Sequence, residues 1–370
     1  MPHDEEMNDS AGPSRRLFLK DLALLGAGGL MFGACASGSS ATALGVSPGS
    51  ASASTSKAMA ERVGIQLFTV RDKMTSDFDG TLAKLAEIGY REVEFFSYGD
   101  RTPQQVKATL DRVGLRSPST HSALRLGPDL EKQLAGYQLM GHKFSAAGGP
   151  AFRRPPGAGG PGGPGAGGAP PAGGPPAGGP PAGGPPAGGP PGAGGQRPPA
   201  PPQTADSVHR QIDEWNQIAA AAKPYGIKVL VHNHTMEFQP FADGRTPFDL
   251  MIAELDPERV VLELDIGWAT VAGKSALDLF AKHPGRFPLW HVKDMGGLAA
   301  LASLTNQGER QRAAKIVPVG QGEIDYAPIF ARAAQSGMQH FFVEQDTAPN
   351  SGDSIAAAKI SFDAIRKTLA

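Results

Sequence analysis

The chain has 370 residues, of which 35 are lysine or arginine and 36 are aspartate or glutamate, so its formal charge is −1. Nucleic-acid-binding proteins usually carry a basic excess, and this balance argues against a nucleic-acid partner. Cys35 is the single cysteine, so no disulfide within one chain can form.

The first 36 residues are predicted to be an export signal. Paired arginines in Ser14-Arg-Arg-Leu-Phe-Leu-Lys20 precede a short apolar run, residues 22–34, which is typical of a signal for the twin-arginine translocation machinery. Cys35 follows a small residue, as at a bacterial lipoprotein cleavage site, and the same stretch would also serve an ordinary signal peptidase. We therefore expect the protein in the periplasm, either soluble or held by a lipid anchor at Cys35, with a disordered spacer at residues 37–60.

A second segment, residues 148–202, is dominated by glycine, proline and alanine. Its repeated unit, Pro-Pro-Ala-Gly-Gly, has a period of five, which excludes a collagen helix because that helix needs glycine at every third residue. Such a composition cannot bury apolar area and predicts disorder. About 260 residues remain outside these segments, which suits a single barrel of eight strands and eight helices.

The remaining chain, residues 61–370, alternates apolar strand-like runs with amphipathic helical patterns. The pattern is clearest at residues 103–113, where Thr102 can cap a helix that begins with Pro103 and ends before Gly114. Strands are expected at residues 62–70, 90–96, 115–121, 142–147, 227–234, 259–265, 288–293 and 338–344. Helices are expected at residues 77–88, 103–113, 128–140, 204–223, 246–255, 275–283, 324–336 and 351–369. Eight alternations predict a (β/α)8 TIM barrel with the Gly/Pro-rich insertion in its fourth strand-to-helix loop.

The last four predicted strands end in residues that can bind a metal. Residues two apart on a strand share a face, so these pairs should point inward together. The pairs are His232 with His234, Glu263 with Asp265, His291 with Lys293, and Glu344 with Asp346. Carboxylates and imidazoles from neighbouring strand ends would hold one divalent ion such as Mn²⁺, Mg²⁺, Co²⁺ or Zn²⁺.

These motifs resemble the sugar phosphate isomerase/epimerase proteins of the xylose isomerase-like TIM-barrel superfamily. The resemblance covers nearly all of residues 62–370 outside the insertion. Its most specific parts are residues 232–238, 263–268, 291–294, 319–325 and 343–346. The resemblance implies that Glu237, Asp265, His291 and Glu344 bind the metal and that Glu237 and Glu344 form the acid/base pair. Strand five departs from the family pattern because it ends in His-Asn-His, which leaves His232 as an alternative first ligand with Glu237 only nearby.

Other polar residues near the predicted strand ends are candidates for substrate contacts. They are Glu94, His121, His232, His234 and Lys293. Three of them also have a structural alternative: His121 as a hydrogen-bonded histidine, Lys293 as a surface lysine, and Glu94 as the ion-pair partner of an arginine.

The leading hypothesis is a metal-dependent sugar or keto-sugar isomerase or epimerase that removes a proton next to a carbonyl. A 3-keto-glycoside lyase or hydratase would use the same metal and base, and a periplasmic sugar-binding lipoprotein without turnover is an alternative of another class. The superfamily also contains metal-dependent endonucleases for damaged DNA, against which the neutral charge argues.

Overall fold

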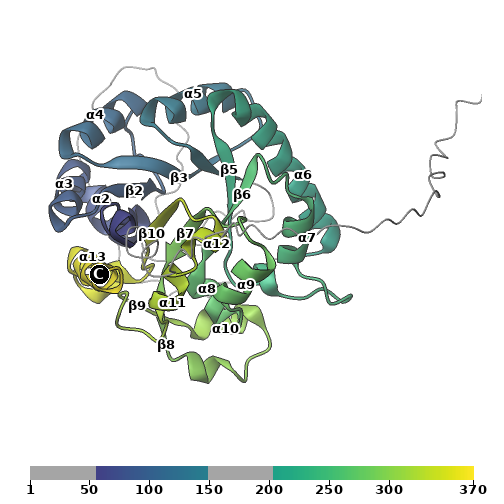
Figure 1. Ribbon diagram of the computed structural model, residues 1–370. Helices are drawn as coiled ribbons and strands as arrows, with labels where there is room; N and C mark the ends of the chain where they lie inside the picture. Colours follow the sequence, from purple (N-terminus) through teal and green to yellow (C-terminus); the bar gives the residue numbers. More distant parts are fainter. Residues whose placement is uncertain (1–55, 149–202) are drawn as a thin grey trace, which may run out of the picture. The chain divides into compact units, whose positions relative to one another are not determined.

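The computed structural model describes residues 56–148 and 203–370. Eight parallel strands close into a barrel in the order β1-β10-β7-β6-β5-β4-β3-β2, which confirms the predicted TIM barrel. Figure 1 shows these strands surrounded by the connecting helices. The barrel strands are β1 (Gly64–Gln66), β2 (Glu92–Phe95), β3 (Arg116–Leu124), β4 (Phe144–Ala147), β5 (Lys228–His232), β6 (Val260–Asp265), β7 (Leu289–Val292) and β10 (His340–Val343).

The helices begin and end at residues whose side chains or backbone conformations favour a helix terminus. Thr102 accepts a hydrogen bond from the Gln105 amide at 3.3 Å, and the helix that follows ends at Gly114, whose φ is 74°. The helices are α2 (Arg71–Ser76), α3 (Phe78–Ile88), α4 (Pro103–Val113), α5 (Leu130–Met140), α6 (Ala205–Ala222), α7 (Pro247–Glu254), α8 (Ile266–Val271), α9 (Ala276–Lys282), α10 (Gln307–Ala313), α11 (Tyr326–Phe330), α12 (Ala333–Ser336) and α13 (Ser354–Thr368). None of the helices within residues 56–148 and 203–370 is long and apolar enough to cross a membrane.

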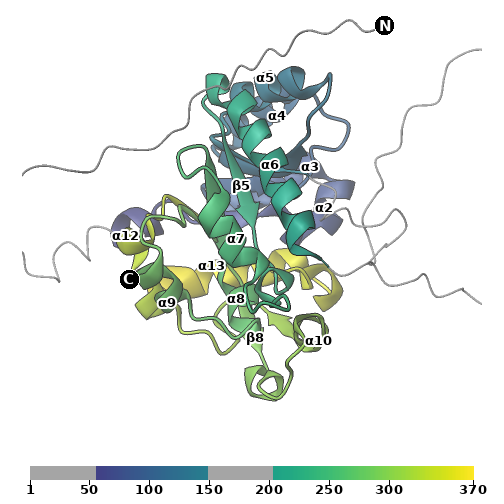
Figure 2. The same cartoon turned by 90° about the vertical axis from the view of Figure 1, so that its right-hand side faces the viewer.

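Several elements differ from the sequence-based expectation. The first strand is shorter, because Gln66 accepts a hydrogen bond from the Phe68 amide at 2.8 Å and the chain turns into a 3-10 helix, Leu67–Val70. The single helix expected at residues 324–336 is divided into α11 and α12. The long connection after β7 contains a small antiparallel pair, β8 (Asp294–Gly296) and β9 (Lys315–Val317), which lies with α10 next to α8 (Figure 2).

The export signal and most of the insertion lie outside the described residues. Residues 56–60 are helical and Met59 is buried in the core, so ordered structure begins before the expected boundary at residue 61. β4 ends at Ala147 and α6 begins at Ala205, so the insertion falls in the fourth strand-to-helix connection.

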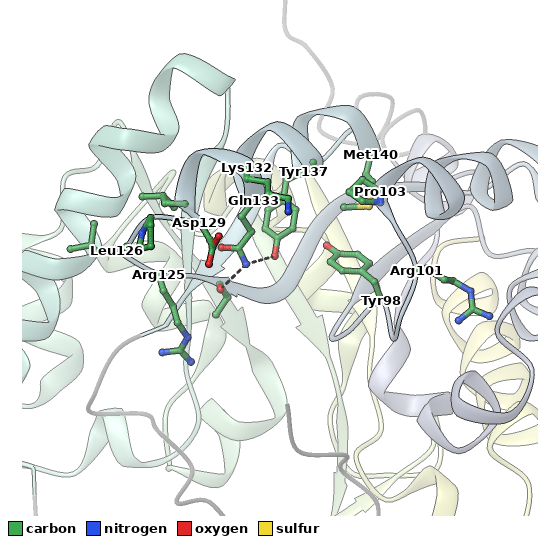
Figure 3. A pocket seen from close by; sticks show the side chains of 15 residues that line it. Tyr98, Arg101, Pro103, Arg125, Leu126, Asp129, Lys132, Gln133, Tyr137 and Met140 are labelled. Atoms are coloured by element: carbon green, nitrogen blue, oxygen red, sulfur yellow. Dashed lines mark hydrogen bonds between the residues drawn. The ribbon is translucent and has the colours of Figure 1, made fainter. Parts of the chain in front are cut away.

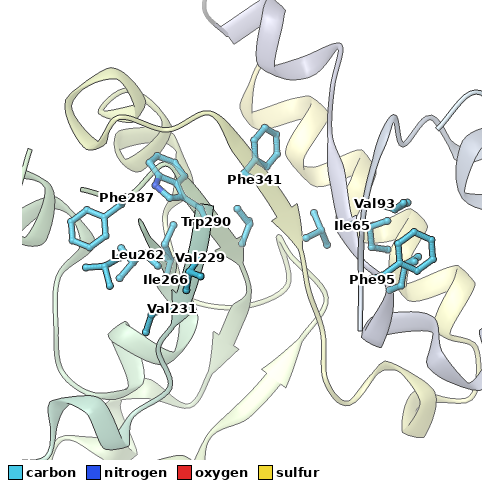
Figure 4. Close-up of a cluster of buried hydrophobic side chains, with 14 of the residues drawn as sticks. Ile65, Val93, Phe95, Val229, Val231, Leu262, Ile266, Phe287, Trp290 and Phe341 are labelled. Atoms are coloured by element: carbon cyan, nitrogen blue, oxygen red, sulfur yellow. The ribbon is translucent and has the colours of Figure 1, made fainter. Parts of the chain in front are cut away.

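Apolar side chains fill two layers of the barrel. One cluster packs between the strands and the helices, where the rings of Phe280 and Trp290 stack with centroids 5.0 Å apart; part of this cluster is drawn in Figure 4. A second cluster fills the barrel interior with Phe144, Leu230, Val261, Leu289 and Phe342. Because inward-facing positions alternate along each strand, the residues that follow this interior cluster toward the strand ends can carry polar groups.

Candidate metal centre

The structure brings the predicted polar residues together at the carboxyl ends of the strands. Glu94 lies on β2, His121 on β3, His232 on β5, Asp265 at the end of β6 and His291 on β7. Lys293 and Glu344 follow β7 and β10, and His234 and Glu237 follow β5. Glu94, Asp265 and His291 are fully buried, so this end of the barrel holds several charged groups away from water.

Four of these residues form what we call the outer donor set: His232, Asp265, His291 and Glu344. One ligand atom from each lies within 4.8 Å of the others. His232 Nε2 is 3.7 Å from Asp265 Oδ2, and His291 Nδ1 is 2.7 Å from Glu344 Oε2. Two imidazoles and two carboxylates are suitable ligands for a divalent transition metal.

A second group, which we call the inner donor set, consists of His121, His232, Glu263 and His291. Glu263 Oε2 lies 2.5 Å from His121 Nε2, 3.2 Å from His232 Nδ1 and 3.4 Å from His291 Nε2. The strand period of two places Glu263 on the inward face, but it gives no reason to prefer it over Asp265. A contact with His121 on β3, 142 residues away in sequence, becomes visible only in the fold.

Glu94 holds His291 from the opposite side of the outer donor set. Its Oε2 is 2.6 Å from His291 Nε2 and accepts a hydrogen bond from Gln66, while Ser119 donates to its Oε1 at 2.5 Å. A carboxylate on one imidazole nitrogen fixes the ring and directs the other nitrogen toward a metal. Glu94 Oε2 also lies 3.4 Å from His121 Nε2, and within the described chain no arginine is among the partners of Glu94.

Lys293 is only 1% exposed and contacts three carboxylates. Its Nζ is 2.9 Å from Asp265 Oδ2, 3.0 Å from Glu344 Oε2 and 2.7 Å from Asp346 Oδ2. Burial alone would lower the pKa of Lys293, but these carboxylates outweigh it and hold the pKa well above its usual value. The lysine is therefore a buried cation that shares two carboxylate oxygens with the outer donor set.

Glu237 lies in a 3-10 helix, Met236–Phe238, and belongs to neither donor set. Its Oε2 accepts a hydrogen bond from the His234 amide at 2.7 Å. Burial raises the pKa of Glu237 to about 7. A carboxyl group with such a pKa can both accept and return a proton near neutral pH.

Glu263 Oε1 is buried without a hydrogen-bond partner in the described chain, whereas Asp265 Oδ2 and His291 Nδ1 lie in ion pairs with Lys293 and Glu344. Buried polar atoms are nearly always hydrogen-bonded, so atoms that are not indicate a ligand. Burial also raises the pKa of Asp265 to about 6, because it outweighs the opposing effect of the nearby Lys293 and His291 charges. The residues present therefore fit a divalent ion.

The loop after β9 supports the end of β7. The amides of Gly320 and Gly322 donate to Asp294 Oδ2 at 2.9 and 3.0 Å. A Cβ on Gly322 would lie 2.1 Å from Asp294 Oδ1, so only glycine permits this approach. The Tyr326 hydroxyl donates to the Lys293 carbonyl at 2.8 Å, which further fixes the segment that carries Lys293.

A separate cavity of about 730 Å³ lies between α5 and the loops that follow β2 and β3 (Figure 3). Tyr98, Arg101, Arg125, Lys132 and Tyr137 are among its lining residues. Ala123 also lines it and lies two residues after His121 on β3.

The fold and the site define the class of protein. Residues 187–368 match the family model of the xylose isomerase-like TIM barrel, and the chain folds as a closed barrel of eight parallel strands. Inosose dehydratase from Lacticaseibacillus casei is 27% identical over 163 residues, covering 39% of this chain and 51% of that protein. The chain thus spans about half the length of the curated relatives that it matches.

Solved structures support the same fold. A sugar phosphate isomerase/epimerase from Parabacteroides distasonis superimposes with a TM-score of 0.55 at 18% identity, over 82% of this chain and 96% of that one. The IOLI protein, solved with a bound zinc atom, superimposes with a TM-score of 0.52 at 12% identity, over 83% and 98%. At these identities the likeness concerns the fold.

Proposed function

We propose that this protein is a divalent-metal-dependent enzyme that removes a proton next to the carbonyl group of a sugar, keto-sugar or ketone of a cyclitol. The observation that carries the proposal is the outer donor set beside Glu237, a buried carboxyl group with a pKa of about 7. Both isomerisation and dehydration of such substrates begin with this proton transfer.

His232, Asp265, His291 and Glu344 are the proposed ligands. When bound there, a divalent ion supplies Lewis acidity that stabilises negative charge on the carbonyl oxygen. His232 takes the place of Glu237 in the ligand group that the family resemblance implies, because His232 contacts Asp265 and Glu237 lies outside both donor sets.

Glu237 is the better base of the two predicted carboxylates. Burial opposes ionisation of Glu344, but Lys293 and His291 outweigh it and hold the pKa of Glu344 well below its usual value. A carboxylate of low pKa suits a ligand, whereas a proton acceptor works best when its pKa lies near the working pH. Glu344 therefore holds charge, and Glu237 moves the proton.

Lys293 has a supporting role in this proposal. Because its ammonium group contacts Asp265, Glu344 and Asp346, it balances the negative charge of the ligands. His121 and His234 lie close enough to the ligand His232 to contact substrate oxygens, with ring centroids 5.1 and 4.9 Å from its ring.

The relatives favour elimination as the second step. Inosose dehydratases eliminate water, and a 3-keto-glycoside lyase would eliminate an aglycone by the same proton transfer. Isomerisation would instead return the proton to a neighbouring carbon. The predicted twin-arginine signal, residues 1–36, supports an unphosphorylated substrate, because phosphorylated sugars are mainly cytoplasmic.

The test is to incubate metal-loaded protein in deuterated water with free sugars, keto-sugars, inososes and 3-keto-glycosides, and to follow carbon-bound hydrogens by NMR. Elimination releases water or the aglycone, and isomerisation returns substrate with deuterium. Glu237→Gln should slow either reaction by about 100-fold or more with metal retained, since general bases contribute roughly that factor. The exposed Glu258→Gln is the control.

Two results would contradict the proposal. Bound metal and bound sugar without any exchange would identify a binding protein. Full exchange in Glu237→Gln would transfer the role of base to Glu344 or to a histidine after β5.

A further inference from the structure

The inner and outer donor sets use opposite nitrogens of the same two histidines. His232 directs Nδ1 to Glu263 and Nε2 to Asp265. The Nε2 of His291 contacts Glu94 at 2.6 Å and lies 3.4 Å from Glu263, and its Nδ1 contacts Glu344. The two imidazoles therefore stand between two possible cation positions, one below the other in the barrel.

Two of the three contacts of Glu263 in the inner donor set have the spacing of a tetrahedral site, and the third, 2.5 Å to His121 Nε2, is a direct hydrogen bond that an ion would have to open. Metal bonds of about 2.0–2.1 Å place neighbouring ligand atoms roughly 3.3 Å apart in a tetrahedron. Glu263 Oε2 is 3.2 Å from His232 Nδ1 and 3.4 Å from His291 Nε2. The second oxygen of Glu263 is buried without a hydrogen-bond partner, so this carboxylate is not committed to another role.

The two positions cannot be filled together by neutral imidazoles. A neutral imidazole has one nitrogen with a free lone pair and one that carries a proton. If His232 and His291 bind an ion in one set, their other nitrogens are protonated and face the carboxylates of the other set. One ion per chain can therefore occupy either position.

The sets differ in chemistry as well as in depth. The inner set offers three imidazole nitrogens and one carboxylate, whereas the outer set offers two of each. Imidazole suits Zn²⁺, and carboxylate suits Mn²⁺ and Mg²⁺. Glu94 Oε2, 2.6 Å from His291 Nε2, would be a further neighbour of an inner ion.

We infer that the barrel contains a second, inner cation site, formed by His121, His232, Glu263 and His291, that binds Zn²⁺ and excludes an ion from the outer donor set. The inference depends on the proposed function only in assuming that the outer donor set binds the ion that supports turnover. Zn²⁺ in the inner site leaves the contacts of Lys293 with Asp265 and Glu344 intact. Zinc bound there would compete with the ion that supports turnover.

The experiment separates the sets by residues that belong to only one of them. His121 is in the inner set and Glu344 in the outer set, so His121→Gln and Glu344→Gln are compared with wild type in the full chain. Metal-free protein is titrated separately with Zn²⁺ and Mn²⁺ by equilibrium dialysis and elemental analysis. The partly exposed surface residue His209, which contacts Glu254, provides the control His209→Gln.

Wild type should bind one ion of either metal, with Zn²⁺ displacing Mn²⁺ one for one. His121→Gln should weaken Zn²⁺ binding by more than about 100-fold and Mn²⁺ binding by less than about 10-fold, since a lost ligand costs at least as much as the 10–100-fold of a lost outer-shell partner. Glu344→Gln should give the reverse. Glu263→Gln is a second inner variant if His121→Gln does not fold.

Other results would overturn the inference. If Glu344→Gln weakens both metals and His121→Gln neither, there is one outer site and the inner residues only orient its histidines. Two ions bound at once would refute mutual exclusion. If neither metal binds to wild type, the proposed function fails together with the inference. If the wild type binds metal only at the outer donor set, the inference fails and the proposed function stands.

Discussion

Replacement of Lys293 tests how the buried charges are balanced. The change Lys293→Met keeps the length of the side chain but leaves Asp265, Glu344 and Asp346 without the ammonium group that lies within 3.0 Å of each. Removing one partner of a buried ion pair costs about 3–5 kcal/mol. For a domain of this size about 2–4 °C corresponds to 1 kcal/mol, so Tm in a chelator should fall by roughly 6–20 °C.

A divalent ion should compensate for this loss. Asp265 Oδ2 and Glu344 Oε2 face both Lys293 and the outer donor set, so an ion meets more negative charge in the variant and binds more tightly. An ion at 100 times its Kd stabilises a protein by about 2.7 kcal/mol, and each tenfold gain in affinity adds about 1.4 kcal/mol.

Thermal unfolding followed by circular dichroism, in chelator and in excess Mn²⁺, measures both effects. The exposed Lys359→Met, which removes only a surface pair with Asp363, is the control and should change stability by less than about 1 kcal/mol. The reasoning is refuted if Lys293→Met unfolds at the wild-type temperature in chelator, or if Mn²⁺ stabilises wild type and variant equally.

Two further predictions concern parts of the fold away from the metal centre. Burial lowers the pKa of His142 to about 4, while the unfolded residue takes up its proton near pH 6.5, so its contribution to stability is complete above about pH 6.5 and is lost as the pH falls toward 4. Urea unfolding at pH 7.5 and 4.5 should show a loss larger in wild type than in His142→Gln, by up to about 3 kcal/mol, and equal losses would contradict this. Gly337 has a φ of 80°, and a Cβ there would lie 2.9 Å from the Cα of Gly285. Gly337→Ala should therefore destabilise the protein more than Gly244→Ala, which has a similar φ of 84° but open space around it and should cost only about 1–2 kcal/mol of backbone strain; equal values from urea unfolding would argue against the clash.

The sequence was sufficient for the barrel because its signals are local and repeated. Eight apolar runs with intervening helical patterns require parallel strands, and the Thr102, Pro103 and Gly114 signals mark one helix to the residue. The short elements were not predictable in this way. α8 has six residues, and β8 and β9 have three each, which is too few for a period to be recognised. Long-range contacts, such as that of Asp294 with the loop after β9, hold these elements in place.

The strand ends gave the location of the site, because parallel strands in a barrel present their carboxyl ends on one face. The choice between His232 and Glu237 as a ligand depends on how the chain turns after β5. The 3-10 helix Met236–Phe238 places the Glu237 carboxylate on the His234 amide, a direction that residue spacing cannot give. The role of Glu263 depends on His121, which comes from a distant strand.

Strand β6 explains why the inner site has a definite depth. Its successive inward positions are Val261, which belongs to the apolar interior cluster, then Glu263 in the inner donor set, then Asp265 in the outer one. Two residues of a parallel strand rise by roughly 6.6 Å, so each donor set occupies one layer of the barrel. Phe144, Leu230 and Phe342 fill the layer of Val261 and offer no ligand atom, so an ion that enters from the strand ends can go no deeper than Glu263. The imidazoles of His232 and His291, with a nitrogen toward each layer, are then the groups that decide which of the two layers holds the ion.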